Sequence, residues 1–260
     1  MGHKVLVIMP THNKADRIKY SINSVLKQTY PYFDFAIVGD GVSNDTRQVI
    51  EEFKKIDKRI TFYDNEKGYE KMGEENRDKV IKDFPDAEYI TYLADDDLFI
   101  KNHIEVMLRE IKGYDFVHPF PMFITHDNKN IFFKKYLDNK NDFLFMLHKP
   151  GNNFISLTGV MHSRKIYDKS PGWTKTPKEY PVDKYMWEKI LSVPECRYKT
   201  SRKSTMIKLG NKDYRGTDEQ ELMLIKKWYS LINNSDFVDL WNKYLLKYMK
   251  DNMIPLNPKI

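Results

Sequence analysis

The triplet Asp95-Asp96-Asp97 has the residue type and the position that chemistry with a divalent cation requires. It directly follows a mostly apolar run at residues 88–93. Adjacent carboxylates repel one another and raise each other's pKa unless a cation lies among them. Mg²⁺ and Mn²⁺ prefer oxygen ligands, commonly one or two carboxylates together with substrate phosphates. A solvated acidic turn before the next helix is the structural alternative, and the position after an apolar strand favours the metal site.

Two further polar segments, Pro10-Thr11-His12-Asn13 and Gly39-Asp40-Gly41, also follow apolar runs. Ligands of open α/β sheets bind beyond the carboxyl ends of the strands. We therefore expect both segments and the Asp triplet to converge on one rim of a sheet. Glycines on both sides of Asp40 allow a tight turn and the close approach of a ligand, although an Asp-Gly turn is also common without any ligand.

The elements that must position these residues alternate along the first 110 residues. The sequence predicts strands at 4–9, 33–38, 60–63 and 88–93, and helices at 15–26, 44–53, 72–81 and 102–111. This alternation predicts an α/β fold with a Rossmann-like, mostly parallel sheet and helices on both faces. The second half is less regular, with strands expected near 115–118, 122–125 and 157–162, a helix at 183–191, and two C-terminal helices within 217–250.

The composition is that of a globular chain with a sizeable core. Of the 260 residues, 41% are hydrophobic and 31% charged, which excludes a disordered tail. The single cysteine, Cys196, excludes an internal disulfide and a cysteine-based zinc site and fits a reducing compartment. No run approaches the ~20 apolar residues of a membrane helix, so we expect a cytoplasmic protein.

The net charge of +6 is compatible with several kinds of anionic partner and does not distinguish between them. A basic, non-enzymatic nucleic-acid-binding protein is one alternative, but no RNA- or DNA-binding motif is present and we expect no nucleic-acid partner. The phosphate loop, the Gly-x-Gly-x-x-Gly fingerprint and the Gly-x-Ser-x-Gly elbow are absent from the sequence. A nucleotidyltransferase on a related sheet is another alternative, although residues 11–15 lack the Gly-rich basic loop that it would need.

Four blocks of the sequence, taken together, resemble family 2 glycosyltransferases of the GT-A fold. They lie at residues 5–13, 24–30, 40–45 and 88–97, and the likeness extends over roughly residues 4–200. Segment 159–162 resembles the segment before the acceptor-side helix in spore-coat polysaccharide-type members, and segment 181–187 resembles the helix start that carries the family's catalytic carboxylate. The resemblance implies inverting, metal-dependent transfer of a sugar from a nucleotide diphosphate, UDP by default, to an acceptor hydroxyl in surface polysaccharide or glycan synthesis.

The resemblance also implies roles for individual residues. Asp183 would be the general base that takes the proton of the acceptor, whereas the sequence alone favours an N-cap of the helix at 183–191. Asp97, or Asp96 in the spore-coat register, would bind Mn²⁺ or Mg²⁺. The residues that would hold the donor nucleotide sugar are Pro10, Thr11, His12, Asn13, Asp40, Gly41, Lys71, Arg77, Asp95 and Asp96. Arg77 could equally be a solvated helix residue.

Three departures from the family pattern are visible. His12 stands where Tyr or Phe is usual, and Gly39 replaces the first acid of Asp-Asp-Gly. No histidine follows His162, so the late histidine that binds the metal in some GT-A enzymes cannot exist here. The processive signature Gln-x-x-Arg-Trp is missing, and we expect a non-processive, hexosyltransferase-like enzyme.

We predict a catalytic domain at 1–208, with a nucleotide-sugar-binding half at 1–112 and an acceptor half at 113–208. Residues 209–260 would form a C-terminal helical extension, rich in aromatic residues and lysine. Packing of its aromatic face on the catalytic domain is the favoured interpretation. Peripheral contact with the inner face of the membrane, or with a second copy of the chain, is the alternative. The acceptor would be a glycan or a lipid-linked glycan.

Overall fold

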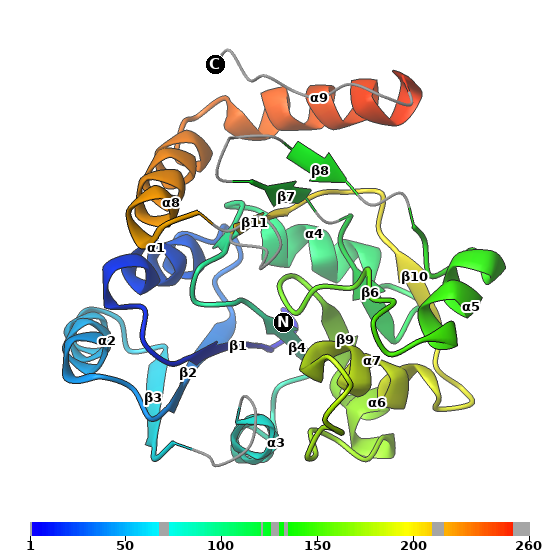
Figure 1. Cartoon of the computed structure of the whole chain (residues 1–260), viewed down its shortest axis with the longest axis horizontal. Coiled ribbons are helices and arrows are strands. Elements are labelled where there is room, and N and C mark those ends of the chain that lie inside the picture. The colour runs from blue at the N-terminus through cyan, green and yellow to red at the C-terminus, as the bar shows by residue number, and fades with distance from the viewer. Residues whose placement is uncertain are drawn as a thin grey trace.

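The structure is a computed structural model that describes residues 2–67, 73–120, 122–125, 130–132, 135–209 and 216–251, without side chains at 130–132 and 246–251. Within these residues a 7-stranded sheet has the strand order β10-β6-β9-β4-β1-β2-β3 (Figure 1). Its strands are β1 (Val5–Thr11), β2 (Phe33–Asp40), β3 (Ile60–Asn65), β4 (Tyr89–Tyr92), β6 (Phe116–His118), β9 (Met161–Ser163) and β10 (Tyr198–Thr200).

The sheet is parallel except at β9. Strand β1 runs parallel to both of its neighbours, so that Val5 pairs with Phe33 of β2 and with Tyr89 of β4. β3 is parallel to β2, and β10 is parallel to β6. β9 is antiparallel to β4 and β6. The carboxyl ends of β1, β2 and β4 therefore lie at the same edge, and the prediction of a mostly parallel α/β sheet is confirmed.

Helices cover both faces of this sheet, and alternate side chains of β1 enter two different cores. Val5, Val7 and Met9 pack with α1 (Ala15–Leu26), α2 (Asn44–Ile56) and α4 (His103–Glu110). Leu6 and Ile8 pack with α3 (Glu74–Asp83), α6 (Arg164–Lys169) and α7 (Val182–Leu191), and α5 (Lys140–His148) joins the same core through Met146. All five β1 residues from 5 to 9 are fully buried, as expected for a central parallel strand.

A smaller sheet lies beyond the end of β4. Its order is β5-β11-β7-β8, with β5 (Leu98–Phe99), β11 (Met206–Leu209), β7 (Met122–Ile124) and β8 (Asn130–Phe132). Two helices, α8 (Asp218–Ile232) and α9 (Phe237–Asp251), close a third core with it. α8 lies beside α1 and continues into α9 across the smaller sheet (Figure 1).

The aromatic side chains of the C-terminal helices contribute to this third core. Trp228 of α8 and Trp241 of α9 are 2% and 6% exposed. The indole Nε1 of Trp241 also donates to the backbone oxygen of Ser204 at 2.8 Å. These contacts favour packing over lipid contact for the aromatic face. In the part of the chain that the structure describes, no helix is both long and apolar enough to cross a bilayer. The domain boundaries stay a prediction.

Strand β1 is longer than the sequence indicates, because it continues through Pro10 to Thr11. Pro10 pairs with Val38 and Thr11 with Gly39, so that the missing N–H of proline removes one donor without ending the ladder. The strand expected near 157–162 is shorter and later, as β9. The sequence did not predict six of the elements, which are β5, β8, β10, β11, α5 and α6. The four strands among them have two to four residues each, which is too few to show a period in hydrophobicity.

Candidate active site

The edge formed by the ends of β1, β2 and β4 joins the polar segments that the sequence places there. Thr11 Oγ1 donates to Asp95 Oδ2 at 2.7 Å, which connects β1 to the Asp triplet. His12 Nδ1 donates to the backbone oxygen of Asp40 at 2.7 Å, which connects β1 to β2. The expected convergence of the three segments on one rim is therefore present in the structure.

The hydrogen bonds of His12 define its tautomer. The Asp40 carbonyl can only accept, so Nδ1 carries the proton, and Nε2 then accepts from Asn13 Nδ2 at 3.1 Å. Asn13 Oδ1 in turn accepts the backbone N–H of Ser43 at 2.8 Å. Both His12 and Asn13 remain exposed, so a ligand on the rim could reach them. Pro10 lies inside β1, where it pairs with Val38 and its ring fixes the backbone φ angle one residue before Thr11.

Gly41 adopts a left-handed conformation, with φ of 65°. A Cβ at this position would lie 2.6 Å from the Cβ of Lys67, so the turn requires glycine for its conformation and for its packing. Lys67 forms an ion pair with the Asp40 carboxylate, and Asp40 is 7% exposed. Lys71 lies outside the described residues.

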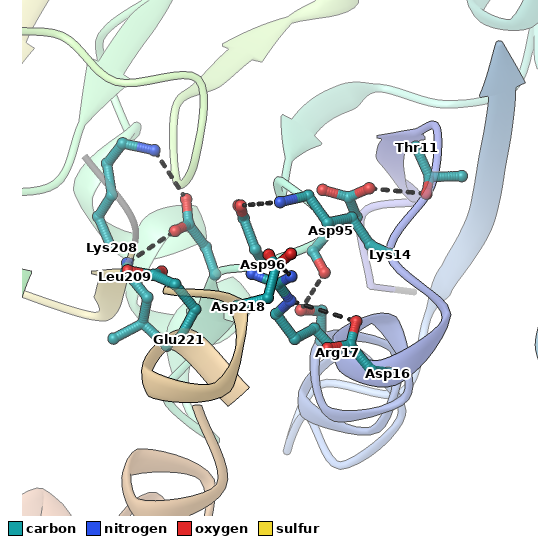
Figure 2. A network of polar contacts seen from close by, with 12 residues as sticks. Thr11, Lys14, Asp16, Arg17, Asp95, Asp96, Lys208, Leu209, Asp218 and Glu221 are labelled. Carbon is teal, nitrogen blue, oxygen red and sulfur yellow. Dashed lines mark hydrogen bonds and ion pairs between the residues drawn. The ribbon is translucent and has the colours of Figure 1, made fainter. Parts of the chain in front are cut away.

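The three carboxylates of the Asp triplet have different partners, and Figure 2 labels Asp95 and Asp96. Asp95 accepts from Thr11, and Asp96 forms an ion pair of 3.3 Å with Lys14 at the start of α1. Burial raises the pKa of Asp95, and the negative charge of Asp96 adds to the shift. Mutual repulsion therefore makes positive charge favourable at this rim.

Asp97 is completely buried and has three donors. Its Oδ1 accepts the backbone N–H of Leu209 at 2.8 Å, and its Oδ2 accepts from Thr158 Oγ1 at 2.5 Å. The ammonium of Lys208 lies 3.2 Å from the same Oδ2. Figure 2 shows the bonds from Lys208 and Leu209 meeting at one carboxylate. Burial raises the pKa of Asp97, and the charge of Lys208 opposes the shift.

The Asp triplet fits a divalent ion in its chemistry. Asp96 and Asp97 offer the oxygen donors that Mg²⁺ and Mn²⁺ prefer, and the raised pKa of Asp97 means that added positive charge stabilises its ionised form. No group of three or more His, Cys, Asp or Glu side chains among the described residues is arranged to hold a metal. The ion would therefore depend on substrate phosphate and water for its remaining ligands.

Asp183 lies in the first turn of α7, whose N-cap is Pro181. The interpretation of Asp183 as the N-cap is therefore wrong by two positions. Its Oδ1 accepts the backbone N–H of Lys184 at 2.8 Å and Asn153 Nδ2 at 3.3 Å. Burial raises the pKa of Asp183, while the Lys208 charge acts against the shift. A raised pKa suits a general base, a role that stays a prediction.

Arg77 is 3% exposed on α3, so it is not a solvated helix residue. Its guanidinium carbon lies 4.8 Å from the ring centroid of Trp173. Burial lowers the pKa of Arg77, and the charges of Asp183 and Asp40 are among those that oppose the shift. The opposing charges, led by Glu74, include one candidate residue from each half of the site.

Sequence reasoning did not pair the candidate carboxylates with their partners. The partners are Lys14, Lys67, Asn153, Thr158 and Lys208. The partner of Asp40 is 27 residues away, and Lys208 is 111 residues away from Asp97. Nothing in the sequence distinguishes these lysines from the other basic residues, because their pairing depends on the tertiary fold.

The sheet, its helices and the rim of carboxylates define a protein of the glycosyltransferase GT-A fold. The model of the family "Glycosyl transferase family 2" matches residues 6–171, and the chain belongs to this family. It is 36% identical over 104 residues to the Escherichia coli UDP-Glc:alpha-D-GlcNAc-diphosphoundecaprenol beta-1,3-glucosyltransferase WfgD, covering 40% of this chain and 39% of that protein. The chain spans about two fifths or less of the length of the first curated relatives.

Two solved structures show the same fold. S. aureus TarS 1–349 in complex with UDP-GlcNAc superposes with a TM-score of 0.57 and 13% identity, over 95% of this chain and 71% of that chain. The mannosyltransferase PcManGT from Pyrobaculum calidifontis, in complex with GDP-Man and Mn²⁺, superposes with a TM-score of 0.58 and 11% identity, over 96% and 76%. At these identities the likeness is one of fold.

Proposed function

We propose that this chain transfers a sugar from a nucleotide diphosphate to an acceptor hydroxyl, with inversion at the sugar. One observation carries the proposal. Asp97, which directly precedes β5, lies 3.2 Å from the Lys208 ammonium, and the negative charge of Asp183, in the first turn of α7, also raises the pKa of Lys208. This supports a donor-side carboxylate and a candidate base near one lysine, as a transfer between two substrates requires.

The donor is proposed to lie along the rim. Thr11, His12, Asn13 and Asp40 would contact its base and ribose, and UDP is the default nucleotide. The names of the relatives support a nucleotide sugar, because WfgD is named for UDP-Glc and the TarS complex contains UDP-GlcNAc. Mn²⁺ or Mg²⁺ would be held by Asp96 and Asp97, and when bound it would neutralise charge on the leaving diphosphate.

Asp183 is proposed to take the proton of the acceptor hydroxyl. As the acceptor oxygen forms its bond to the anomeric carbon, the bond from that carbon to the diphosphate oxygen breaks and the electron pair leaves with the diphosphate. This single displacement inverts the anomeric centre. A positioned general base contributes typically ~10²–10⁴ in rate. The positive charge of Arg77 acts to lower the raised pKa of Asp183, which favours its ionised form.

The acceptor is proposed to be a lipid-linked glycan. WfgD is named for a diphosphoundecaprenol-linked acceptor, and such an acceptor would place the reaction at the inner face of the membrane. Contact with that membrane, or with a second copy of the chain, through the C-terminal helices remains a prediction. Family membership favours this function over a nucleotidyltransferase or a nucleic-acid-binding protein.

A thermal-shift panel tests the proposal. UDP, GDP, dTDP, CDP and their sugar conjugates are compared with and without Mn²⁺. A ligand that binds only the folded state raises the melting temperature in proportion to RT ln(1 + [L]/Kd), so we expect one nucleotide series to stabilise the chain more with Mn²⁺. Stabilisation by no nucleotide diphosphate, with or without the metal, would contradict the proposal.

A further inference from the structure

Lys208 lies opposite Asp97 because the backbone of the smaller sheet places it there. β11 pairs antiparallel with β5, so that Met206 is opposite Phe99 and Ile207 is opposite Leu98. The same register, continued by one residue, brings Lys208 opposite Asp97. The Leu209 N–H donates to Asp97. Two paired strands, rather than a chance contact of a flexible side chain, therefore determine the position of Lys208.

Strand alternation directs the Lys208 side chain to the site. Its neighbours Ile207 and Leu209 are buried in the apolar core beneath α8, so Lys208 faces the opposite way. Its side chain is 23% exposed, whereas the Asp97 side chain is completely buried. The lysine is thus the more accessible member of the pair.

Lys208 faces negative charge at the rim, because its ammonium lies 3.2 Å from Asp97 Oδ2. A diphosphate that enters a rim of carboxylates meets repulsion, and a fixed ammonium reduces that repulsion. Lysine is a common phosphate ligand that acts as a point charge.

We propose that Lys208 binds the diphosphate of the donor directly and provides part of the affinity for it without a metal ion. The proposal rests on the proposed function, since it assigns a residue to the donor's leaving group. In this arrangement Asp97 positions the ammonium at the rim, and a divalent ion adds to a positive charge that the chain already supplies.

Isothermal titration in EDTA tests the assignment, with inorganic pyrophosphate and UDP as probes. Lys208→Met should weaken both ligands about tenfold to a hundredfold, as expected from the loss of one charge-assisted hydrogen bond. Lys208→Arg keeps the charge and should stay within about threefold of the wild type.

Lys199→Met is the matched control. Lys199 forms an ion pair of 3.1 Å with Glu110 and is 22% exposed, close to the 3.2 Å and 23% of Lys208, but it lies on β10. The control removes one charge from a lysine of similar exposure in an ion pair of similar length, and the affinity of Lys199→Met for both probes should equal that of the wild type.

Removal of Lys208 alone leaves Asp97 buried without a cation, which could unfold the chain. The double variant Asp97→Asn, Lys208→Met avoids this charge and is compared with Asp97→Asn alone. We expect the double variant to bind pyrophosphate in EDTA about tenfold to a hundredfold more weakly than Asp97→Asn does.

Equal metal-free affinity of wild type and Lys208→Met, or of Asp97→Asn and the double variant, would overturn the assignment. Binding of UDP by the wild type only with Mn²⁺ would also overturn it and leave the proposed function standing. Failure of every nucleotide diphosphate to bind the wild type, even with Mn²⁺, would instead mean that the proposed function is wrong.

Discussion

The hydroxyl of Thr11 donates a 2.7 Å hydrogen bond to Asp95 Oδ2, which joins the last residue of β1 to the first residue of the Asp triplet. From α1, Ser21 Oγ donates to the backbone oxygen of Asp95 at 3.0 Å. The side chain and the backbone of Asp95 are therefore both positioned by the protein. Such preorganisation lowers the cost of binding a ligand in a fixed geometry.

Thr11→Val should weaken the donor site and destabilise the chain. The substitution keeps the shape of the side chain but removes the donor to Asp95, and the loss of one such hydrogen bond costs about 1 kcal/mol in the free energy of unfolding. Urea denaturation and UDP titration measure the two effects. Thr61→Val on β3, where the side chain is exposed, is the control, and equal stability of the two variants would contradict the role of the bond.

Asp183→Asn should separate catalysis from binding. The amide cannot take a proton, so we expect release of the nucleotide diphosphate from the donor sugar to slow by ~10²–10⁴, while the Kd of UDP stays within about twofold. Asp168→Asn on α6, whose side chain is 55% exposed, serves as the control and should keep the wild-type rate. A rate near wild type in Asp183→Asn would rule out Asp183 as the base.

The protein should lose stability against unfolding in acid, because three of its histidines are buried. Burial lowers the pKa of His103 and His118 to about 3 and that of His162 to about 4. The unfolded chain binds protons near pH 6.5 that the folded chain excludes, so stability is complete above that pH and falls from about pH 6.5 down to about 3. Each histidine contributes up to ~1.4 kcal/mol per pH unit in this window.

Urea denaturation at pH 7.5, 6.0 and 5.0 measures this dependence. Tyr92 donates to His162 Nε2, and Trp173 Nε1 donates to Tyr92, so the imidazole is held neutral by a buried chain of bonds. His162→Gln should reduce the slope of stability with pH, whereas His148→Gln, at an exposed position, should leave it unchanged. A wild-type stability that is constant from pH 7.5 to 5.0 would be the contrary result.

Trp228→Ala tests whether α8 is part of the folded core. Its indole is 2% exposed among the side chains of the smaller sheet, and such a truncation costs about 3–5 kcal/mol in the free energy of unfolding. Met223→Ala, at 64% exposure on the same helix, should change stability by less than about 0.5 kcal/mol. Similar urea midpoints for the two variants would show that α8 does not stabilise the smaller sheet.

The first half of the fold could be predicted because its elements are long and periodic. Residues 5–9 are apolar at every position, as both faces of β1 are covered, and α1 buries Ile18, Ile22 and Val25 at helical spacing. The polar segments after β1, β2 and β4 were placed on one rim from the geometry of parallel strands alone, and the bonds of Thr11 and His12 agree with that placement.

The rest depends on contacts between distant parts of the chain. β5 has two residues and shows no period, yet its pairing with β11 brings Lys208 to Asp97. The sequence placed Asp183 at the start of a helix. It did not show that Pro181 is the N-cap and that Asp183 lies within the first turn. Lys14 and Lys208 have partners that only the tertiary fold defines.

A titration of UDP into the wild type and Asp97→Asn, with Mn²⁺ and in EDTA, tests most directly whether the Asp triplet is the nucleotide-diphosphate site. The asparagine keeps an oxygen for the Leu209 N–H but loses the charge. We predict that Mn²⁺ tightens UDP binding at least about tenfold in the wild type and that Asp97→Asn loses this gain. An equal gain from Mn²⁺ in both proteins would contradict the assignment of the metal and the diphosphate to this rim.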